Sequence, residues 1–344
     1  MRAVQLIATG APLEERALPL PTPAAGEVLV EVRAAGICHS DVHYRAGAPR
    51  PKMLPRTLGH EIAGVVSAVG PGVASLQPGA RVAVNYVLHC GDCTHCRAGR
   101  ENYCALVGMI GSSRDGGYAD HVLVPARNAL PIPDTLPFER AAIMMCSTAT
   151  AFHALRVAAL APRESLCVLG FGGLGLSAAA LAPVLFAGAV IVVDTVADKL
   201  AAARAMGART VEPGPLLSEH IRQAADGRGV DVVLDFVGHA ATTHAALGAL
   251  AHGGRLVSVA LSRETLPIDP YLDLIAREVR ILGCNDHLAS ELRELVDLAG
   301  RGALDLSRAV TRTIPLSAAA INVVFDEIEA RTSHFRTVIV PGPA

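Results

Sequence analysis

The hydrophobic and polar positions follow one pattern in the first part of the chain and another in the second. Up to about residue 147, short apolar–polar alternations such as 28–36, 61–70 and 80–87 are separated by frequent prolines and glycines. Alternation with a period of two predicts β-strands. From about residue 148, strand-like apolar runs alternate with longer helical segments. This second pattern predicts right-handed crossovers and a parallel, doubly wound sheet, so that the fold class is α/β.

The elements expected in the second part can be given by residue range. The strands are 165–170, 190–194, 230–238 and 255–261, and the helices are 174–188 and 196–208. Beyond about residue 286 follow two helical segments and a last strand, at 289–302, 317–330 and 336–340. Pro183 lies inside the helix expected at 174–188, where it removes one backbone hydrogen bond. We therefore expect a kink or an early end there.

Composition narrows the class of protein. The chain has 344 residues, of which 51% are hydrophobic and 18% charged, and its formal net charge is -2. These values predict two domains with large cores, and they give no sign of a nucleic-acid or membrane-surface partner. The charge-free stretch 165–193 is broken by glycines and by Pro183, so we expect no membrane helix there. We expect a cytoplasmic protein.

Four of the eight cysteines fall within one short stretch. They are Cys90, Cys93, Cys96 and Cys104. Four thiolates at this spacing can surround one tetrahedral zinc and leave no open position, which is typical of a structural site. Four free surface cysteines or a redox pair would explain the pattern less well, because exposed thiols oxidise and a redox pair needs no third and fourth cysteine.

A second group of metal-ligating residue types is spread along the chain. Cys38, His60 and Glu61 offer a thiolate, an imidazole and a carboxylate, and Cys146 is a plausible remote ligand at the end of the first part. A catalytic zinc takes three protein ligands and keeps one position open. Each residue alone would more often belong to the core. Their joint occurrence with the four-cysteine loop favours a catalytic metal site.

A glycine-rich turn follows the strand at 165–170. Its G-x-G-x-x-G pattern uses Gly170, Gly172 and Gly175 and opens a helix. Such a turn lets the backbone approach a pyrophosphate at a helix N-terminus. Asp194 ends the next strand, where a carboxylate can bind the adenosine ribose and would repel the phosphate of NADP. These features predict an NAD site.

Together these motifs resemble the zinc-dependent alcohol dehydrogenases of the medium-chain dehydrogenase/reductase superfamily. The signature G-H-E-x2-G-x5-G-x2-V occupies 59–73, the C-H-S-D-x-H segment 38–43, and both stand in the family's order with the four-cysteine loop and the glycine turn. The resemblance implies a GroES-like, mainly β catalytic domain of residues 1–147 and 286–344. It also implies a Rossmann cofactor domain of residues 148–285.

The resemblance further assigns roles around a catalytic zinc. Cys38, His60 and Cys146 would ligate the ion, and Glu61 would be a transient ligand. Asp41 would hold the far nitrogen of His60. Other implied roles are the alcohol-proton acceptor Ser40 and the onward proton carrier His43. Tyr86 is our own candidate for a wall of the substrate pocket.

The implied cofactor contacts are more numerous. They comprise the glycine turn (Gly170, Gly172, Gly173, Leu174 and Gly175), the ribose contacts Asp194 and Lys199, the pyrophosphate-facing His39 and Arg336, and the nicotinamide neighbours Thr150, Val237, Val259 and Leu261. Cys167 and Cys284 have no assigned role, and we expect them in the core.

The expected function is transfer of hydride between a primary or secondary alcohol and NAD, reversible as aldehyde or ketone reduction, with two Zn²⁺ per subunit. A specialised polyol or amino-alcohol dehydrogenase of the same superfamily stays open as an alternative. A zinc-binding nucleic-acid protein and a zinc-free quinone reductase are disfavoured by the Rossmann-type half and by the ligand sets. The resemblance also implies a homotetramer, or alternatively a homodimer, in which the strand at 255–261 could pair with its copy.

Overall fold

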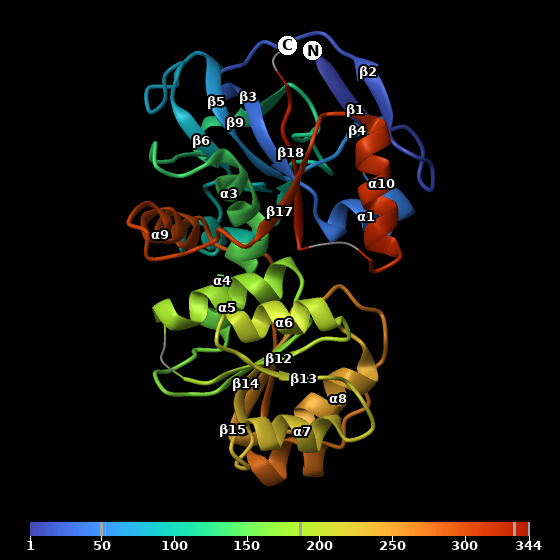
Figure 1. Cartoon of the computed structure of the whole chain (residues 1–344). Helices are drawn as coiled ribbons and strands as arrows, with labels where there is room; N and C mark the ends of the chain where they lie inside the picture. Colours follow the sequence, from blue (N-terminus) through green and yellow to red (C-terminus); the bar gives the residue numbers. More distant parts are fainter. Residues whose placement is uncertain (49–50, 52, 186–187, 333–334, 343–344) are drawn as a thin grey trace. The chain divides into compact units, whose positions relative to one another are not determined.

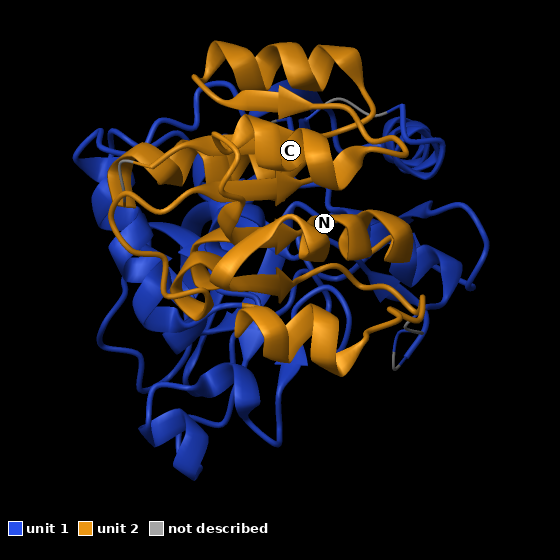
Figure 2. Ribbon diagram, turned by 90° about the horizontal axis from the view of Figure 1, so that it is seen from below, with its two compact units in different colours: residues 1–149, 287–344 blue, residues 150–286 orange. Residues whose placement is uncertain are grey.

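The computed structural model describes residues 1–48, 51, 53–185, 188–332 and 335–342, and the chain forms two compact units (Figure 2). Unit 1 comprises Met1–Ala149 and His287–Ala344, and unit 2 comprises Thr150–Asp286. These bounds differ from the expected ones by two residues or fewer. The return of the chain to unit 1 has a visible consequence in Figure 1, where the C-terminal strand β18 (Arg336–Ile339) lies beside the early strand β3 (Glu27–Gly36).

Unit 1 is mainly β. Its largest sheet has the order β10-β6-β5-β3-β18-β17, with β9 also pairing with β3, beside a smaller sheet β2-β1-β4 and the pair β7-β8. The strands are β1 (Arg2–Leu6), β2 (Glu14–Ala17), β3, β4 (Arg56–Thr57), β5 (Glu61–Val69), β6 (Arg81–Val84), β7 (Val87–Leu88), β8 (Gly108–Met109), β9 (His121–Pro125), β10 (Ala129–Pro131), β17 (Val310–Ile314) and β18.

The helical segments of unit 1 are short and lie between or after these strands. They are α1 (His39–Ala46), α2 (Thr94–Arg97), η1 (Glu101–Tyr103), η2 (Ala126–Asn128), α3 (Phe138–Ile143), the π-helix η3 (Met144–Thr148), α9 (Ala289–Gly300) and α10 (Ala318–Glu329). The core between strands and helices is built of β-branched and aromatic residues such as Val30, Ile62, Val82 and Phe325.

The register of two central strands brings distant segments together. β3 and β5 are antiparallel, and Gly36, the last residue of β3, stands opposite Glu61, the first residue of β5. Cys38 follows Gly36 by two residues, and His60 precedes Glu61. Strand pairing therefore places the two motifs of the second ligand group side by side.

Unit 2 contains a parallel sheet of order β13-β12-β11-β14-β15-β16. Its strands are β11 (Leu166–Leu169), β12 (Val190–Val193), β13 (Arg209–Val211), β14 (Val230–Asp235), β15 (Leu250–Ser258) and β16 (Arg280–Gly283). The helical segments are α4 (Ala149–Val157), α5 (Gly173–Leu185), α6 (Ala197–Ala205), α7 (Leu217–Ala224), α8 (Ala240–Gly248), η4 (Pro270–Leu274) and η5 (Ile275–Arg277).

Strand order reverses at β11, since the chain proceeds to β12 on one side and later to β14 on the other. Right-handed crossovers then place helices on both faces of the sheet. Figure 1 shows α5 and α6 on one face and α7 and α8 on the other. Ligands of doubly wound sheets bind at the carboxyl ends of the strands beside such a reversal. The glycine turn begins at that end of β11.

One sequence expectation needs correction here. The strand expected at 255–261 overlaps β15, which is paired on both sides by β14 and β16, so it is not available for pairing with a copy of itself. The edge strand on this side of the sheet is β16, which was not among the predicted strands. Helix α5 continues past Pro183 to Leu185, and residues 186–187 lie outside the described part; the kink expected at Pro183 stays a prediction. Among the described residues, no helix is long and apolar enough to cross a membrane.

Candidate metal centres and cofactor site

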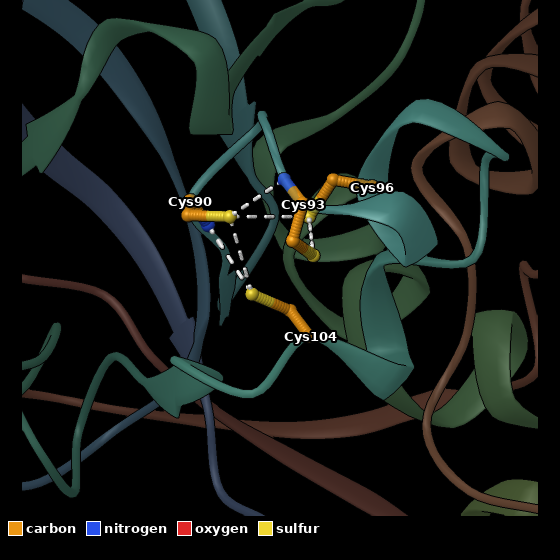
Figure 3. Close-up of side chains that lie close together, drawn as sticks. All are labelled: Cys90, Cys93, Cys96 and Cys104. Carbon is orange, nitrogen blue, oxygen red and sulfur yellow. Dashed lines mark hydrogen bonds between the residues drawn. The ribbon is translucent and has the colours of Figure 1, made fainter.

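The four cysteines of the loop 90–104 direct their sulfur atoms toward one another (Figure 3). The sulfur–sulfur distances are 3.7 Å for Cys90–Cys96, 3.5 Å for Cys93–Cys96 and 3.6 Å for Cys90–Cys104. A tetrahedral zinc with bonds of about 2.3 Å separates its sulfur ligands by about 3.8 Å, whereas a disulfide joins them at about 2.05 Å. The spacing therefore fits a four-thiolate zinc site, and all four cysteines are free of disulfides.

Electrostatics in this loop favour a cation. Backbone N–H groups of Asp92 and Cys93 donate to Cys90 Sγ over 3.4 and 3.3 Å and lower the pKa of Cys90 to about 6. Partial burial, together with the sulfur of Cys93, raises the pKa of Cys96 to about 12. All four sulfurs can be thiolates together only where a cation neutralises them. The donor set thus fits zinc by charge as well as by spacing.

The second group consists of Cys38, His60, Glu61 and Cys146, whose ligand atoms all lie within 4.8 Å of one another. All four are buried. Cys38 precedes α1, His60 and Glu61 begin β5, and Cys146 lies in the π-helix η3. Single π-turns inside helices occur often at functional sites, because the wider turn re-aims a side chain. The fold brings together the dispersed residues that sequence alone could only group by type.

Without a metal, only one of the two thiols in this group, Cys38 and Cys146, is readily deprotonated. Hydrogen bonding from Cys146 and the nearby His60 hold the pKa of Cys38 well below its usual range, despite burial. The pKa of Cys146 is raised well above its usual range by its bond to Cys38 and by burial. A divalent cation would remove this conflict by stabilising both thiolates. The set has two sulfurs and one imidazole, the composition of a catalytic zinc site with an open position.

Glu61 forms a buried ion pair with Arg336 of β18. Its carboxyl is 0% exposed, and burial raises its pKa to about 7 although Arg336 opposes this shift. Oxygen Oε1 has no hydrogen-bond partner among the described residues. A buried carboxylate oxygen without a donor is costly unless a cation comes to it. Arg336 was expected to face the pyrophosphate of the cofactor. Its Nη2 atom instead donates a hydrogen bond to the Glu61 carboxylate. A contact between Arg336 and the cofactor stays a prediction.

Helix α1 carries the expected relay residues. Ser40 Oγ lies 3.8 Å from Cys38 Sγ, and both Ser40 and His43 are half-buried. The ring of His43 lies 4.7 Å from that of His39, which is exposed. Partial desolvation of the ring and the neighbouring His43 lower the pKa of His39. A hydroxyl therefore lies beside the buried thiol, and two imidazole rings lie together on the same helix.

Tyr86, the expected pocket wall, is 2% exposed and packs edge-on against two histidine rings. Its ring centroid lies 5.0 Å from that of His60 and 5.0 Å from that of His287. His287 also contacts Asn85, with its Nε2 3.2 Å from Asn85 Oδ1. The sequence analysis did not single out His287, and no local motif marks it. Its position beside Tyr86 depends on the return of the chain to unit 1.

In unit 2, the glycine turn and the strand ends form the candidate dinucleotide site. A Cβ at Gly175 would lie 2.1 Å from the carbonyl oxygen of Gly170, so only glycine fits this close approach. A Cβ at Gly172 would meet nothing within 4 Å, which leaves open space above the turn for a pyrophosphate. Asp194 follows β12, where its carboxylate accepts N–H bonds from Phe171 and Val196 at 2.7 and 2.9 Å. These bonds orient the carboxylate beside the turn and leave acceptor capacity for ribose hydroxyls.

A further carboxylate, Asp235 at the end of β14, organises the loops that hold the expected nicotinamide neighbours. Its Oδ1 accepts N–H bonds from Val237 and Gly238, both at 2.9 Å, and its backbone oxygen accepts those of Val259 and Ala260. Its side chain is 1% exposed. Asp235 was not among the predicted site residues. It could have been found in the sequence as a carboxylate that directly follows an apolar strand of the parallel sheet.

The remaining expected positions are these. Thr150 is buried at the start of α4, Lys199 and Val259 are half-buried, and Leu174 is half-buried in the first turn of α5, as is Gly173. Val237 and Leu261 are 45% and 72% exposed. Cys167 lies in the core of unit 2, as expected, whereas Cys284 is only half-buried.

Comparison with known proteins identifies the family to which the chain belongs. Residues 24–134 match the alcohol dehydrogenase GroES-like domain, and residues 173–301 match the zinc-binding dehydrogenase family. The chain belongs to the zinc-dependent alcohol dehydrogenase family of the medium-chain dehydrogenase/reductase superfamily. Its fold is the GroES-like domain joined to a Rossmann-type domain that this family shares.

Individual relatives cover almost the whole chain. An NAD-dependent alcohol dehydrogenase of Sulfurisphaera tokodaii is 35% identical over 99% of this chain and 100% of its own length. A sorbitol dehydrogenase of Bacillus subtilis is 33% identical over 86% of this chain and 84% of its own length. A crystal structure of an NAD-dependent alcohol dehydrogenase superposes with a TM-score of 0.92 at 34% identity, covering 99% of this chain and 100% of that one.

Proposed function

We propose that the protein is an NAD-dependent zinc alcohol dehydrogenase that interconverts a primary or secondary alcohol with its aldehyde or ketone. The observation that carries the proposal is the pairing of two unequal ligand sets in one unit. One set is saturated by four sulfurs, and the other combines two sulfurs and an imidazole with the carboxylate of Glu61. Family membership and the NAD-dependent relatives support the same activity.

The roles of the side chains follow from their chemistry. Zinc held by Cys38, His60 and Cys146 would polarise the substrate oxygen, and NAD bound at the glycine turn would accept the hydride. Ser40 accepts the alcohol proton, and His43 passes it toward solvent. Asp41 fixes the orientation of His60 through its Nδ1 atom, 3.3 Å away. Glu61 would be a transient ligand of that ion, and its ion pair with Arg336 would compete with this role.

The cofactor contacts proposed in unit 2 and on α1 follow the family pattern. Glycines 170, 172, 173 and 175, with Leu174, would receive the pyrophosphate, and Asp194 with Lys199 the adenosine ribose. His39 and Arg336 would neutralise the pyrophosphate charge. Thr150, Val237, Val259 and Leu261 would contact the nicotinamide. The NAD site rests on the orientation of Asp194 beside the turn.

Preference for NAD over NADP tests this site. Repulsion between Asp194 and a ribose phosphate should be worth a few kcal/mol, or on the order of a hundredfold in catalytic efficiency. Asp194→Ser with Thr195→Arg should relax or invert the preference. Asp198→Ser, which removes an exposed carboxylate from the first turn of α6, is the matched control and should leave it unchanged. Equal efficiency of the unmodified enzyme with both cofactors would contradict the proposal.

The substrate class has a second candidate. The sorbitol dehydrogenase among the relatives favours a polyol or amino alcohol as the alternative, and Tyr86 is our proposed wall of the substrate pocket. NADH formation across simple alcohols, polyols and amino alcohols, each with and without a chelator, tests the function. Turnover of simple alcohols that the chelator abolishes supports the primary proposal. Turnover confined to polyols or amino alcohols supports the alternative, and none with either class contradicts both.

A homotetramer is our proposal for the assembly, with a homodimer as the alternative. β16 is an edge strand, and the segment before it carries the exposed apolar residues Ile268, Tyr271, Leu272 and Ile275. A second copy paired along β16 would bury both features. Light scattering should return four copies. Leu272→Glu should weaken assembly and Val323→Glu, on the exposed side of α10, should not; a monomer at micromolar concentration would contradict the proposal.

We propose a cytoplasmic location, because two groups of cysteines have metal-ligand geometry with no disulfide among them, which a reducing compartment preserves. Localisation of a tagged chain in its own host by fractionation tests this assignment, and recovery outside the cytoplasm would contradict it.

A further inference from the structure

The second group of ligands, Cys38, His60, Glu61 and Cys146, is called the open ligand set here. The buried carboxylate of Asp41 joins several of its segments. It is 0% exposed. Its Oδ2 accepts the backbone N–H of Cys38 at 3.0 Å, and its Oδ1 lies 3.2 Å from the N–H of Gly59 and 3.3 Å from Nδ1 of His60. A fourth donor, the hydroxyl of Tyr118, reaches Oδ2 at 2.9 Å. Asp41 thus touches the backbone of one ligand and the ring of another, and Tyr118 completes its donors.

Tyr118 comes from a separate segment that is firmly held. Its backbone N–H donates to the carbonyl of Leu58 at 3.0 Å, and its own carbonyl accepts the N–H of Val4 at 2.8 Å. Its ring packs edge-on against Phe325, with centroids 6.3 Å apart, and the residue is 0% exposed. The side chain therefore has little freedom to move away from Asp41.

The backbone of the His60 segment is shaped around this ring. Gly59 has a φ of +92°, and a Cβ there would lie 2.4 Å from Cδ1 of Tyr118. A side chain at position 59 would be excluded by both the conformation and the ring. The ring position thus sets how closely the turn before His60 approaches Asp41.

We propose that Tyr118 is a positioning residue for the open metal site, acting through Asp41 on His60 and Cys38. This inference rests on the proposed function, because it concerns the metal held by those two residues. Burial and the charge of Asp41 raise the pKa of Tyr118 well above its usual range, so its hydroxyl stays protonated and donates. With Tyr118 donating to Oδ2, the carboxylate cannot rotate, and Oδ1 keeps Nδ1 of His60 in place. The opposite ring nitrogen would then be the one that holds the metal.

Removal of the hydroxyl should loosen the metal. Partners that orient a metal ligand from outside the coordination sphere typically change metal affinity by roughly 10- to 100-fold when they are lost. Tyr118 acts one step further out than Asp41. We therefore expect Tyr118→Phe to speed release of the catalytic zinc by about tenfold, at the lower end of that range, and Asp41→Asn to speed it more.

The experiment measures zinc release to a chelator with a colorimetric zinc indicator, on purified full-length protein without substrate or NAD. Two phases are expected, one for each ligand set. Cys146→Ser identifies the phase of the open set by removing it. Tyr44→Phe is the matched control, because Tyr44 is another buried tyrosine of unit 1 whose hydroxyl lies 3.3 Å from the sulfur of Met109.

The proposal predicts that Tyr118→Phe accelerates only the open-set phase, while Tyr44→Phe changes neither. Unchanged release in Tyr118→Phe overturns it, as does equal acceleration of both phases with a lowered melting temperature, which is the pattern of a merely structural residue. If Tyr118→Phe does not fold, the nearly isosteric Asp41→Asn must accelerate the open-set phase, or the proposal fails. A wild-type protein that lacks the open-set phase would instead refute the metal site of the proposed function.

Discussion

The four-cysteine loop and the open ligand set lie in the same unit but are built in different ways. The loop takes all its ligands from residues 90–104, its sulfurs are mostly half-buried, and backbone N–H groups donate to them. The open set takes its ligands from three separate segments, is fully buried, and has charged neighbours in Asp41 and Arg336. The first arrangement supplies all four ligands that a tetrahedral metal takes. The second leaves one position open and places charged side chains next to the ligands. A structural zinc and a catalytic zinc require these two environments respectively.

The largest expected effect comes from the open set. Cys146→Ser should lower turnover by about 10³-fold or more, because the polarising metal contributes several kcal/mol to the transition state. The variant should retain one zinc per chain and almost the same melting temperature. Turnover near that of the unmodified enzyme, with one zinc lost, would contradict the assignment of this set to catalysis.

Ser40→Ala should cause the next largest loss of activity. Loss of the proton acceptor should reduce alcohol oxidation by about 10²- to 10⁴-fold while both zinc ions stay bound, because Ser40 assists proton transfer and does not hold the metal. Steady-state kinetics and metal analysis of the same preparation check both points. Full activity with unchanged zinc would remove the support for the relay. Loss of zinc would mean that Ser40 has a structural role at the site.

His43→Gln should have a smaller effect, about tenfold near neutral pH, because water can replace a half-buried relay group. The defect should shrink as the pH rises, since hydroxide then takes the proton directly. Activity measured from pH 6 to pH 10 provides the check. A defect that is constant over this range would argue that His43 supports the fold of α1 and carries no proton.

Loss of a ligand from the four-cysteine loop should affect turnover least. Cys93→Ser should lower the free energy of unfolding by roughly 2–5 kcal/mol, comparable to the loss of a covalent crosslink, because four ligands no longer tie the loop together. At a temperature where the variant stays folded, kcat should remain within about threefold of the unmodified value. Denaturant unfolding and kinetics below the transition would test this, and a large loss of kcat in folded protein would contradict a purely structural role.

The two sites also differ in how far sequence could predict them. The spacing of the four-cysteine loop is local, so its ligands could be read directly from residues 90–104. The open set could be grouped only by residue type and resemblance, because the meeting of Cys38 with His60 depends on the register between β3 and β5. Residues without a local motif, such as Tyr118 and His287, could not be found at all, since only the folded chain brings them near His60.

The fold of unit 2 shows the same difference between local and long-range features. Periodicity identified the parallel sheet and the glycine turn, because both leave continuous signals in neighbouring residues. The suggested pairing of the strand at 255–261 with its copy required that strand to be an edge, whereas β16 covers it. The short run of Arg280–Gly283 has only half-buried or exposed side chains, so it lacks the apolar signature of the inner strands. Strand order is a property of the whole sheet and is not encoded at any one strand.

The central claim, that one chain holds two zinc ions in unequal roles, is tested most directly by stepwise chelation. Zinc content and alcohol-dependent NADH formation are measured on the same samples as the chelator concentration rises. The account predicts two zinc ions per chain at the start, and loss of turnover in proportion to the release of one of them while the other remains bound. One zinc or none per chain in carefully prepared protein, or turnover that persists after both ions are released, would contradict it.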